Sequence, residues 1–93
     1  MAIGTRALMN NTVKSNLVAV GDSALMFNGL GAGATEAINN TAVGSKSLYS
    51  NTTGFENTAI RYQSLYSNTT GIFNTASGSG SLHSNTTGSR NTA

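Results

Sequence analysis

The side chains able to do acid–base, metal or nucleophilic chemistry are few in this sequence and lie far apart along it. The only acids are Asp22, Glu36 and Glu56, and His83 is the only histidine. A glycosidase needs two carboxylates at a defined separation, and a metal site needs several ligands close together. Serine is abundant, but it recurs at regular intervals rather than in a Ser-His-acid arrangement. We therefore predict no enzyme, no cofactor and no metal site.

The composition limits the partners that the chain can recognise. Its 93 residues carry a formal net charge of +2, and only 9% of them are charged. So few charges cannot form a stripe that follows a phosphate backbone, and we expect no nucleic-acid partner. Cysteine is absent, and no apolar run is long enough to cross a bilayer. We expect neither a disulfide framework nor membrane insertion by this segment.

Asn, Thr, Ser and Gly make up more than half of the chain, and such polar composition is common in disordered segments. Disordered segments usually also carry a high net charge, which this chain lacks. Its apolar residues recur at fixed positions instead of at random. We therefore expect an ordered repeat structure.

The chain repeats itself with a period of 17 residues. Asn40, Asn57, Asn74 and Asn91 begin successive copies of one pattern, and the first 39 residues follow the same pattern less strictly. A fixed period near 20 without a helical pattern predicts a solenoid, in which each repeat is one rung of a stack. We expect a single repeat domain over 1–93, with rungs near 2–18, 19–41, 42–58, 59–75 and 76–93.

Aligning the rungs places the apolar residues in columns. The most regular is an alanine column, formed by Ala2, Ala19, Ala42, Ala59, Ala76 and Ala93. A leucine column and an Ile/Val column accompany it, and we expect both to point inward as the structural core. Their members are Ile3, Leu8, Val20, Leu25, Val43, Leu48, Ile60, Leu65 and Leu82.

The repeat predicts an all-β structure. Glycine recurs too often for a helix, because each Gly in a helix interior costs about 1 kcal/mol relative to Ala. We interpret Asn-Thr-Ala-Val as one short strand and Ser-Leu-Tyr-Ser as a second, with a corner after each. Gly54, Gly71 and Gly88 lie in the longer corner, Asn-Thr-Thr-Gly-x-x, where we expect them to supply positive φ angles.

Stacked rungs bring equivalent residues to within about 4.8 Å of each other. The asparagine columns should then pair amide to amide and satisfy each other's donors and acceptors. Five rungs at that spacing extend over roughly 25 Å.

An insertion at 29–39 lengthens the second rung to 23 residues, measured between Ala19 and Ala42. Its glycine-rich beginning, 29–34, lacks the Lys-Ser/Thr pair and the helix of a phosphate-binding loop. We expect a surface loop.

The pattern Ala-Ile/Val-Gly-x-x-(Ala/Ser)-Leu, followed by Asn-Thr-Thr-Gly, resembles the head repeats of YadA-like trimeric autotransporter adhesins. It is also similar to the 17-residue Asn-Thr-Ala-x-Gly repeats of bacterial and phage tail-fibre proteins. The resemblance implies a left-handed parallel β-roll, three chains around one axis, and display on a cell surface or a virion. It also implies attachment to a host extracellular matrix protein or a cell-surface glycan. Because neither end carries an atypical capping repeat, we expect a fragment of a longer fibre.

The thin core also favours self-association. One rung encloses little more than one Leu and one Ile/Val side chain, which offsets only part of the entropy lost on ordering a whole rung. Burying a further face against two identical chains improves this balance, so we expect a homotrimer. We expect the small alanine column to face the neighbouring chains.

Aromatic residues recur beside the leucine column and form the best candidate for a recognition stripe. The members of this column are Met9, Met26, Tyr49, Tyr66 and His83. Strand alternation points them to solvent or to a neighbouring chain, where they would contact a sugar or a protein or pack between protomers. Phe55 and Phe73, at the Asn-Thr-Thr-Gly corners, complete the candidate recognition residues.

These expectations converge on a non-enzymatic structural and surface-binding segment of a trimeric adhesin or tail fibre, which holds many weak contacts in register. Two alternatives remain. A regular repeat needs no binding site, so the segment could be a spacer. Stacked threonine pairs also resemble the ladders of ice-binding solenoids, although these pairs lie beside a glycine corner rather than along a flat strand. The pairs are 52–53, 69–70 and 86–87.

Overall fold

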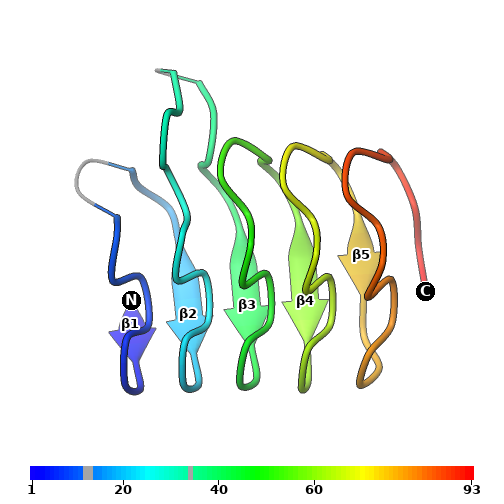
Figure 1. Cartoon of the computed structure of the whole chain (residues 1–93), viewed down its shortest axis with the longest axis horizontal. Coiled ribbons are helices and arrows are strands. Elements are labelled where there is room, and N and C mark those ends of the chain that lie inside the picture. The colour runs from blue at the N-terminus through cyan, green and yellow to red at the C-terminus, as the bar shows by residue number, and fades with distance from the viewer. Residues whose placement is uncertain (12–13, 34) are drawn as a thin grey trace.

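The computed structural model describes residues 1–11, 14–33 and 35–93. These ranges contain strands and no helix. The strands are β1 (Ala2–Ile3), β2 (Val18–Val20), β3 (Thr41–Val43), β4 (Thr58–Ile60) and β5 (Thr75–Ala76). They form one parallel sheet in the order β1-β2-β3-β4-β5 (Figure 1). The predicted all-β parallel arrangement is confirmed. Thr12 and Val13 of the predicted first rung, and Ala34 of the predicted insertion, lie outside the described residues.

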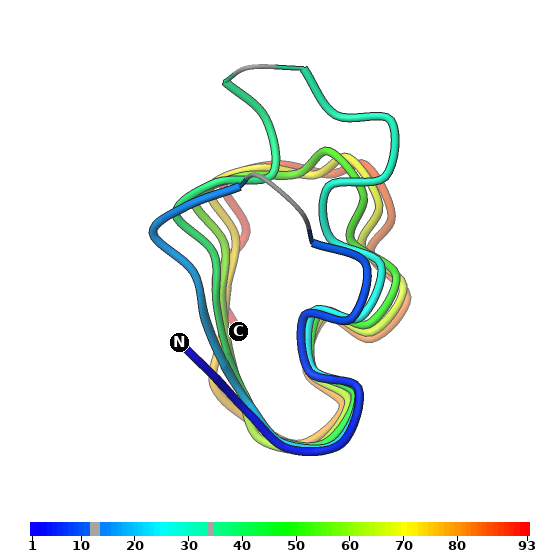
Figure 2. The ribbon, with the colours of Figure 1, turned by 90° about the vertical axis from the view of Figure 1, so that its left-hand side faces the viewer.

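The register of the sheet follows the predicted alanine column. Ala19 pairs with Ala2 and with Ala42, and Ala59 pairs with Ala42 and with Ala76. Viewed along the stack, successive rungs superimpose (Figure 2). The longest dimension of the chain is 29 Å, close to the roughly 25 Å expected for five rungs.

The insertion leaves the common outline of the rungs and forms a projecting loop (Figure 2). Its two ends are held on the next rung, because Gly29 N donates to Thr52 O (2.9 Å) and Ala37 N donates to Thr53 O (3.0 Å). The extra residues therefore leave the register of the third rung unchanged, as expected for a surface loop.

The second predicted strand, Ser-Leu-Tyr-Ser, is wrong. Residues 47–50 form turns, and the leucine has a left-handed backbone, with φ 49° at Leu48. The N–H of Leu48 still donates to Ser64 O of the next rung (3.0 Å), while Asn51 N donates back to Leu48 O (3.2 Å). A left-handed non-glycine residue costs about 1–2 kcal/mol, and burying the leucine side chain offsets this with about 1.5–3 kcal/mol.

The leucine column lies inside the roll, as predicted. Leu25, Leu48 and Leu65 are fully buried, and the terminal Leu8 and Leu82 are partly buried against them. All five have φ between 49° and 53°, so the unusual backbone and the inward side chain occur together at every rung.

The strands point alanine into the roll, and two predictions about them are wrong. Side chains alternate along a strand, so the Ile/Val column faces outward when the alanines face inward. Ile3 is 56% exposed, and Val20, Val43 and Ile60 are only half-buried, so they are not core residues. The alanine column is fully buried within one chain from the second strand to the fifth, so it cannot face neighbouring chains. These alanines are Ala19, Ala42, Ala59 and Ala76.

The corner glycines Gly54, Gly71 and Gly88 are needed for space and not for positive φ, which none of them has. A Cβ on Gly71 would lie against Asn68 Oδ1 and Gly88 O, closer than van der Waals contact allows. Positive φ occurs two residues later in this corner, at Glu56, Phe73 and Arg90 (55°, 56° and 60°), and also at the corner after the strands. There Gly4, Gly21 and Gly44 have φ angles of 126°, 131° and 131°.

A first row of asparagines runs through the interior beside the leucines. Asn51 Nδ2 donates to Asn28 Oδ1 (2.8 Å), and Asn68 and Asn85 extend the row with bonds of 3.0 Å each. The predicted amide-to-amide pairing is confirmed here. Each of these amides also reaches the corner of its own rung, where Asn51 Nδ2 donates to Gly54 O (2.9 Å).

A second row joins the side-chain oxygens to backbone N–H groups instead of to amides. Asn57 N donates to Asn40 Oδ1, and Asn74 N donates to Asn57 Oδ1, both at 3.0 Å. Asn40 Nδ2 donates to Gly54 O (2.8 Å), the same carbonyl that Asn51 uses. In the preceding rung, Leu17 occupies the position equivalent to Asn40 and is buried. The column alignment did not predict this buried leucine.

Replacing Gly71 by Ala should lower the free energy of unfolding by about 2–3 kcal/mol, because the new Cβ overlaps rigid groups on two rungs. The matched control is Gly78→Ala, since a Cβ there meets no atom closer than 3.9 Å and the φ angle is not positive. Chemical denaturation followed by circular dichroism measures the free energy of unfolding of both variants. Equal stability of the two variants would contradict the close-approach role.

Asn68→Ala should lower the free energy of unfolding by about 3 kcal/mol, because it removes the hydrogen bonds to Asn51 Oδ1 and Gly71 O and leaves buried polar groups unpaired. The control is Thr70→Ala, an exposed neighbour in the same corner. Urea denaturation of the two variants checks the difference. A loss no larger than that of the control would show that the ladder contributes nothing to stability.

Candidate binding surfaces

Three of the predicted recognition residues lie together in one aromatic stack. The rings of Tyr49 and Tyr66 are 5.1 Å apart and inclined by 2°, and those of Tyr66 and His83 are 5.0 Å apart and inclined by 6°. Each side chain follows the buried leucine of its own rung, so the stacking distance is close to the rung spacing. The left-handed leucine turns the chain inward, and the next residue then projects half-exposed from the turn.

Phe27 closes one end of the stack and was missed in the sequence. Its ring meets the ring of Tyr49 edge-on, with centroids 5.2 Å apart and an angle of 89°. Phe27 stands one position after the aromatic column, at the place that Ser50 occupies in the next rung. The only signal for it was that Met26, its neighbour, holds the column position where the following rungs have aromatic rings. Met9, at the first rung, is 58% exposed.

The central ring of the stack, Tyr66, has its edge rather than a face available to a ligand. Both faces of Tyr66 are covered by rings, and Tyr49 has Tyr66 on one side and Phe27 near it. An aromatic ring carries negative charge on its faces and positive charge at its edge. Tyr66 therefore offers its polar edge and its phenol hydroxyl instead of the flat platform on which a sugar ring packs.

Phe55 and Phe73 belong to a different corner and form a second, smaller cluster. Their rings are 5.8 Å apart and meet at 75°, and the guanidinium carbon of Arg90 lies 5.3 Å from the centroid of Phe73. Phe73 is 39% exposed. The five predicted recognition residues thus divide between two surfaces.

The outer face of the sheet is a third surface. It carries an apolar row formed by the Ile/Val column, Ile3, Val20, Val43 and Ile60. Beside this row lies a threonine row, in which Thr41 pairs with Thr58 and Thr58 with Thr75. Both rows are straight because their residues sit in paired strands.

The titratable side chains are not gathered into a site. Asp22 and Glu56 are exposed on different corners, and Glu36 accepts a hydrogen bond from Gly33 N (2.7 Å) in the insertion. Among the described residues no three His, Asp or Glu side chains are close enough to hold a metal ion, and no pocket opens between them. That part of the chain also contains no helix long and apolar enough to cross a membrane.

Comparison with known proteins gives no relative: no family model matches the chain, and no curated protein or solved structure matches it significantly.

Replacing Tyr66 by Ser should lower the free energy of unfolding by about 1–2 kcal/mol, because two ring contacts are lost at once. Tyr62→Ser is the control, since Tyr62 is 52% exposed and lies outside the stack, so its loss should change stability by less than about 0.5 kcal/mol. Thermal unfolding and near-ultraviolet circular dichroism of both variants test this. Indistinguishable variants would mean that the stack is not a stabilising contact.

Proposed function

We propose that the chain is a structural and surface-binding segment of a fibre, assembled from three identical chains and displayed outside the cell or on a virion. The observation that carries this proposal is the apolar row on the outer face of the sheet. Val20, Val43 and Ile60 are only half-buried and Ile3 is 56% exposed in a single chain. Such a straight row of branched apolar side chains gains free energy when another surface covers it.

A second copy of the same face is the natural cover for this row. Cyclic symmetry brings identical rows together around one axis, and each rung then meets its equivalents at the same height. Three sheets that face one axis would bury the Ile/Val row and the threonine row while the turns remain outside. The left-handed winding and the trimer are those implied by the resemblance to adhesin and tail-fibre repeats.

In this arrangement the aromatic stack and the turns around it face the surroundings. One assembly carries three equivalent copies of each surface, and a longer fibre of the same repeat carries more. Many weak contacts to a host matrix protein or cell-surface glycan then add up through avidity.

The threonine row supports one rival function. The predicted threonine pairs are engaged at their corner, since Thr52 Oγ1 donates to Thr69 O (3.2 Å) and Thr69 Oγ1 donates to Thr86 O (3.2 Å). Thr41, Thr58 and Thr75 instead stand in register on a flat sheet, the geometry of an ice-binding face. Both functions need the same face, so a chain that buries it in a trimer cannot use it to bind ice.

Sedimentation equilibrium should give about three times the monomer mass of 9.5 kDa, because the apolar row drives association. Val43→Lys should give monomers, since a charge in this row cannot be buried without a partner. Ile3→Lys should also weaken the trimer and is more exposed, so folding is less at risk.

Tyr62→Lys is the control, an exposed position outside the row that should leave the mass unchanged. Circular dichroism establishes that each variant retains its sheet. A folded wild-type monomer would defeat the trimer. If that monomer also showed thermal hysteresis that Thr58→Leu abolished, ice binding would replace surface attachment as the proposed function.

A further inference from the structure

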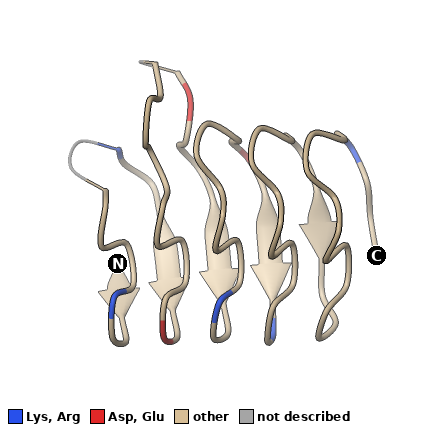
Figure 3. Cartoon of the chain, in the orientation of Figure 1, with Lys and Arg blue, Asp and Glu red and all other residues tan. Residues whose placement is uncertain are grey.

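Positive charge gathers on one edge of the roll, along the turns that follow the strands. Arg6 follows β1, Lys46 follows β3 and Arg61 follows β4, whereas one acid, Asp22, follows β2 (Figure 3). Three of the five cations of the chain therefore lie on this edge against one of its three acids. We call this surface the basic edge.

The cations elsewhere already have partners within the chain. Lys14 Nζ donates to Gly33 O of the insertion, and Arg90 lies over the ring of Phe73. Within the described residues the side chains of Arg6, Lys46 and Arg61 make no hydrogen bond or ion pair. Their charges are directed to the surroundings.

The turns of the basic edge are stacked in register, so Arg6 and Lys46 lie on a line parallel to the axis of the roll, while Arg61 stands two positions earlier in its own turn, at the place of Gly44. Ser23 N donates to Thr5 O (2.8 Å), and Lys46 N donates to Asp22 O (2.8 Å). Arg6 and Lys46 consequently occupy equivalent positions two rungs apart, a separation of about 10 Å at the spacing of parallel strands. This line suits an extended ligand with repeated negative charges.

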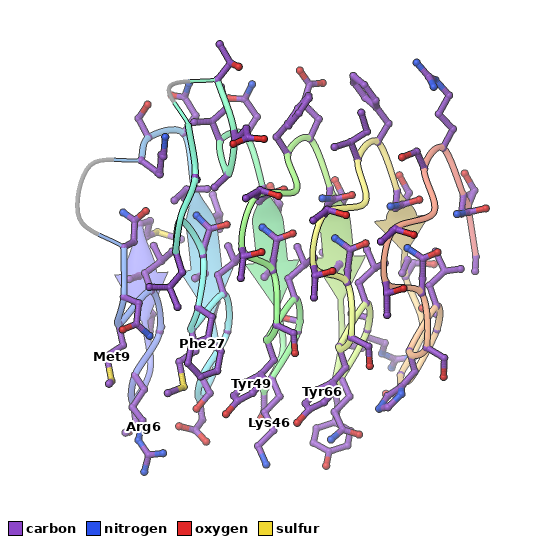
Figure 4. All side chains as sticks on the ribbon, turned by 45° about the horizontal axis from the view of Figure 1, so that its top comes forward. Arg6, Met9, Phe27, Lys46, Tyr49 and Tyr66 are labelled. Carbon is purple, nitrogen blue, oxygen red and sulfur yellow. The ribbon has the colours of Figure 1, made fainter. Side chains whose placement is uncertain are left out.

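The tyrosines of the aromatic stack project from the same edge. Figure 4 shows Arg6, Lys46, Tyr49 and Tyr66 pointing away from the ribbon on this side of the molecule. The phenol hydroxyls of Tyr49 and Tyr66 bond to no other described residue, and parallel rings 5.1 Å apart hold them in a row. Hydroxyl donors and positive ring edges thus project on the same side of the molecule as the cations.

We infer that the basic edge binds a linear acidic polysaccharide, one that carries uronate or sulfate groups along its length. This inference rests on the proposed function and names the class of surface that the segment attaches to. The cations pair with the acidic groups, and the tyrosine hydroxyls donate to the oxygens of neighbouring sugars. No pocket is present among the described residues, so the ligand lies along the edge and makes repeated weak contacts.

The same geometry disfavours two other ligands. A neutral glycan packs its sugar rings on exposed aromatic faces, and here neighbouring rings cover both faces of Tyr66 and one face of Tyr49. Single-stranded nucleic acid also needs free aromatic faces for its bases, and three cations neutralise too few phosphates to hold a duplex. An acidic polysaccharide needs neither.

The test measures binding of immobilised heparin and polygalacturonate to the full chain by biolayer interferometry, with neutral dextran and single-stranded DNA as comparison ligands. Binding to both acidic polysaccharides should exceed binding to dextran and DNA, and it should weaken as salt shortens the Debye length below about 10 Å. Lys46→Gln and Arg61→Gly should each reduce affinity by about two- to fivefold, the effect of one exposed charge.

Arg61→Gly is a favourable variant, because the equivalent residue of the preceding rungs is Gly and Arg61 has φ 88°. Arg90→Gln is the matched control, since it removes the same charge from another corner and should leave affinity unchanged. Asp22→Asn should raise affinity by about two- to fivefold, because it removes the one acid of the edge.

Sedimentation in the same buffer separates the two proposals. An assembled trimer that binds no acidic polysaccharide, or that binds dextran or DNA equally well, overturns this inference and leaves the fibre segment standing. Equal losses of affinity in Arg90→Gln and Lys46→Gln also overturn this inference, since the positive charge would then act regardless of its position on the surface. A monomeric chain that binds acidic polysaccharide refutes the trimer and supports the basic edge as the binding surface.

Discussion

Buried asparagine amides impose the strictest constraint on this chain, because an amide inside a protein must find a partner for each donor and acceptor. Asn51 and Asn68 find theirs on the adjacent rung and on the glycine carbonyl of their own corner. These bonds form only when successive turns of the chain have the same shape and rise. The 17-residue period is therefore a requirement of the interior hydrogen bonds as well as of the sheet. An insertion is tolerated only if it leaves the outline of the rung, as residues 29–39 do.

The corner glycines and the left-handed leucines follow from the same constraint. Gly71 lacks a side chain because Asn68 Oδ1 and Gly88 O occupy the space that a Cβ would take. Leu65 adopts φ 51° because that turn brings its side chain into the narrow interior while its backbone still bonds to the next rung. At the leucine of each rung, the local strain is offset by the burial of the side chain.

The sequence predicted the arrangement of rungs better than the direction of side chains. Period and column alignment are enough to predict parallel pairing, its register, and the inward leucines. They could not decide which of two adjacent columns, alanine or Ile/Val, faces inward, since both patterns fit an alternating strand. Hydrophobicity favoured Val43, but it is Ala42 that faces inward and is fully buried. Likewise, residues 47–50 and 64–67 contain no glycine or proline that would distinguish the leucine turns there from a strand.

The candidate surfaces were predictable in part. Repeated spacing brought Tyr49, Tyr66 and His83 into one column, and the structure places their rings in contact. The sequence could not show that the rings cover each other's faces, because that depends on side-chain orientation. Phe27 joins them from the neighbouring position, which no column alignment includes.

The buried amides also bear on covalent modification. Asn51-Thr-Thr and Asn68-Thr-Thr match the acceptor sequence for N-linked glycosylation, yet both amide nitrogens are sealed inside the roll and bonded to glycine carbonyls. An oligosaccharyltransferase cannot reach them once the rungs have closed. A glycan attached earlier, to the nascent chain of a eukaryotic expression host, would occupy the place of the ladder and keep that rung open.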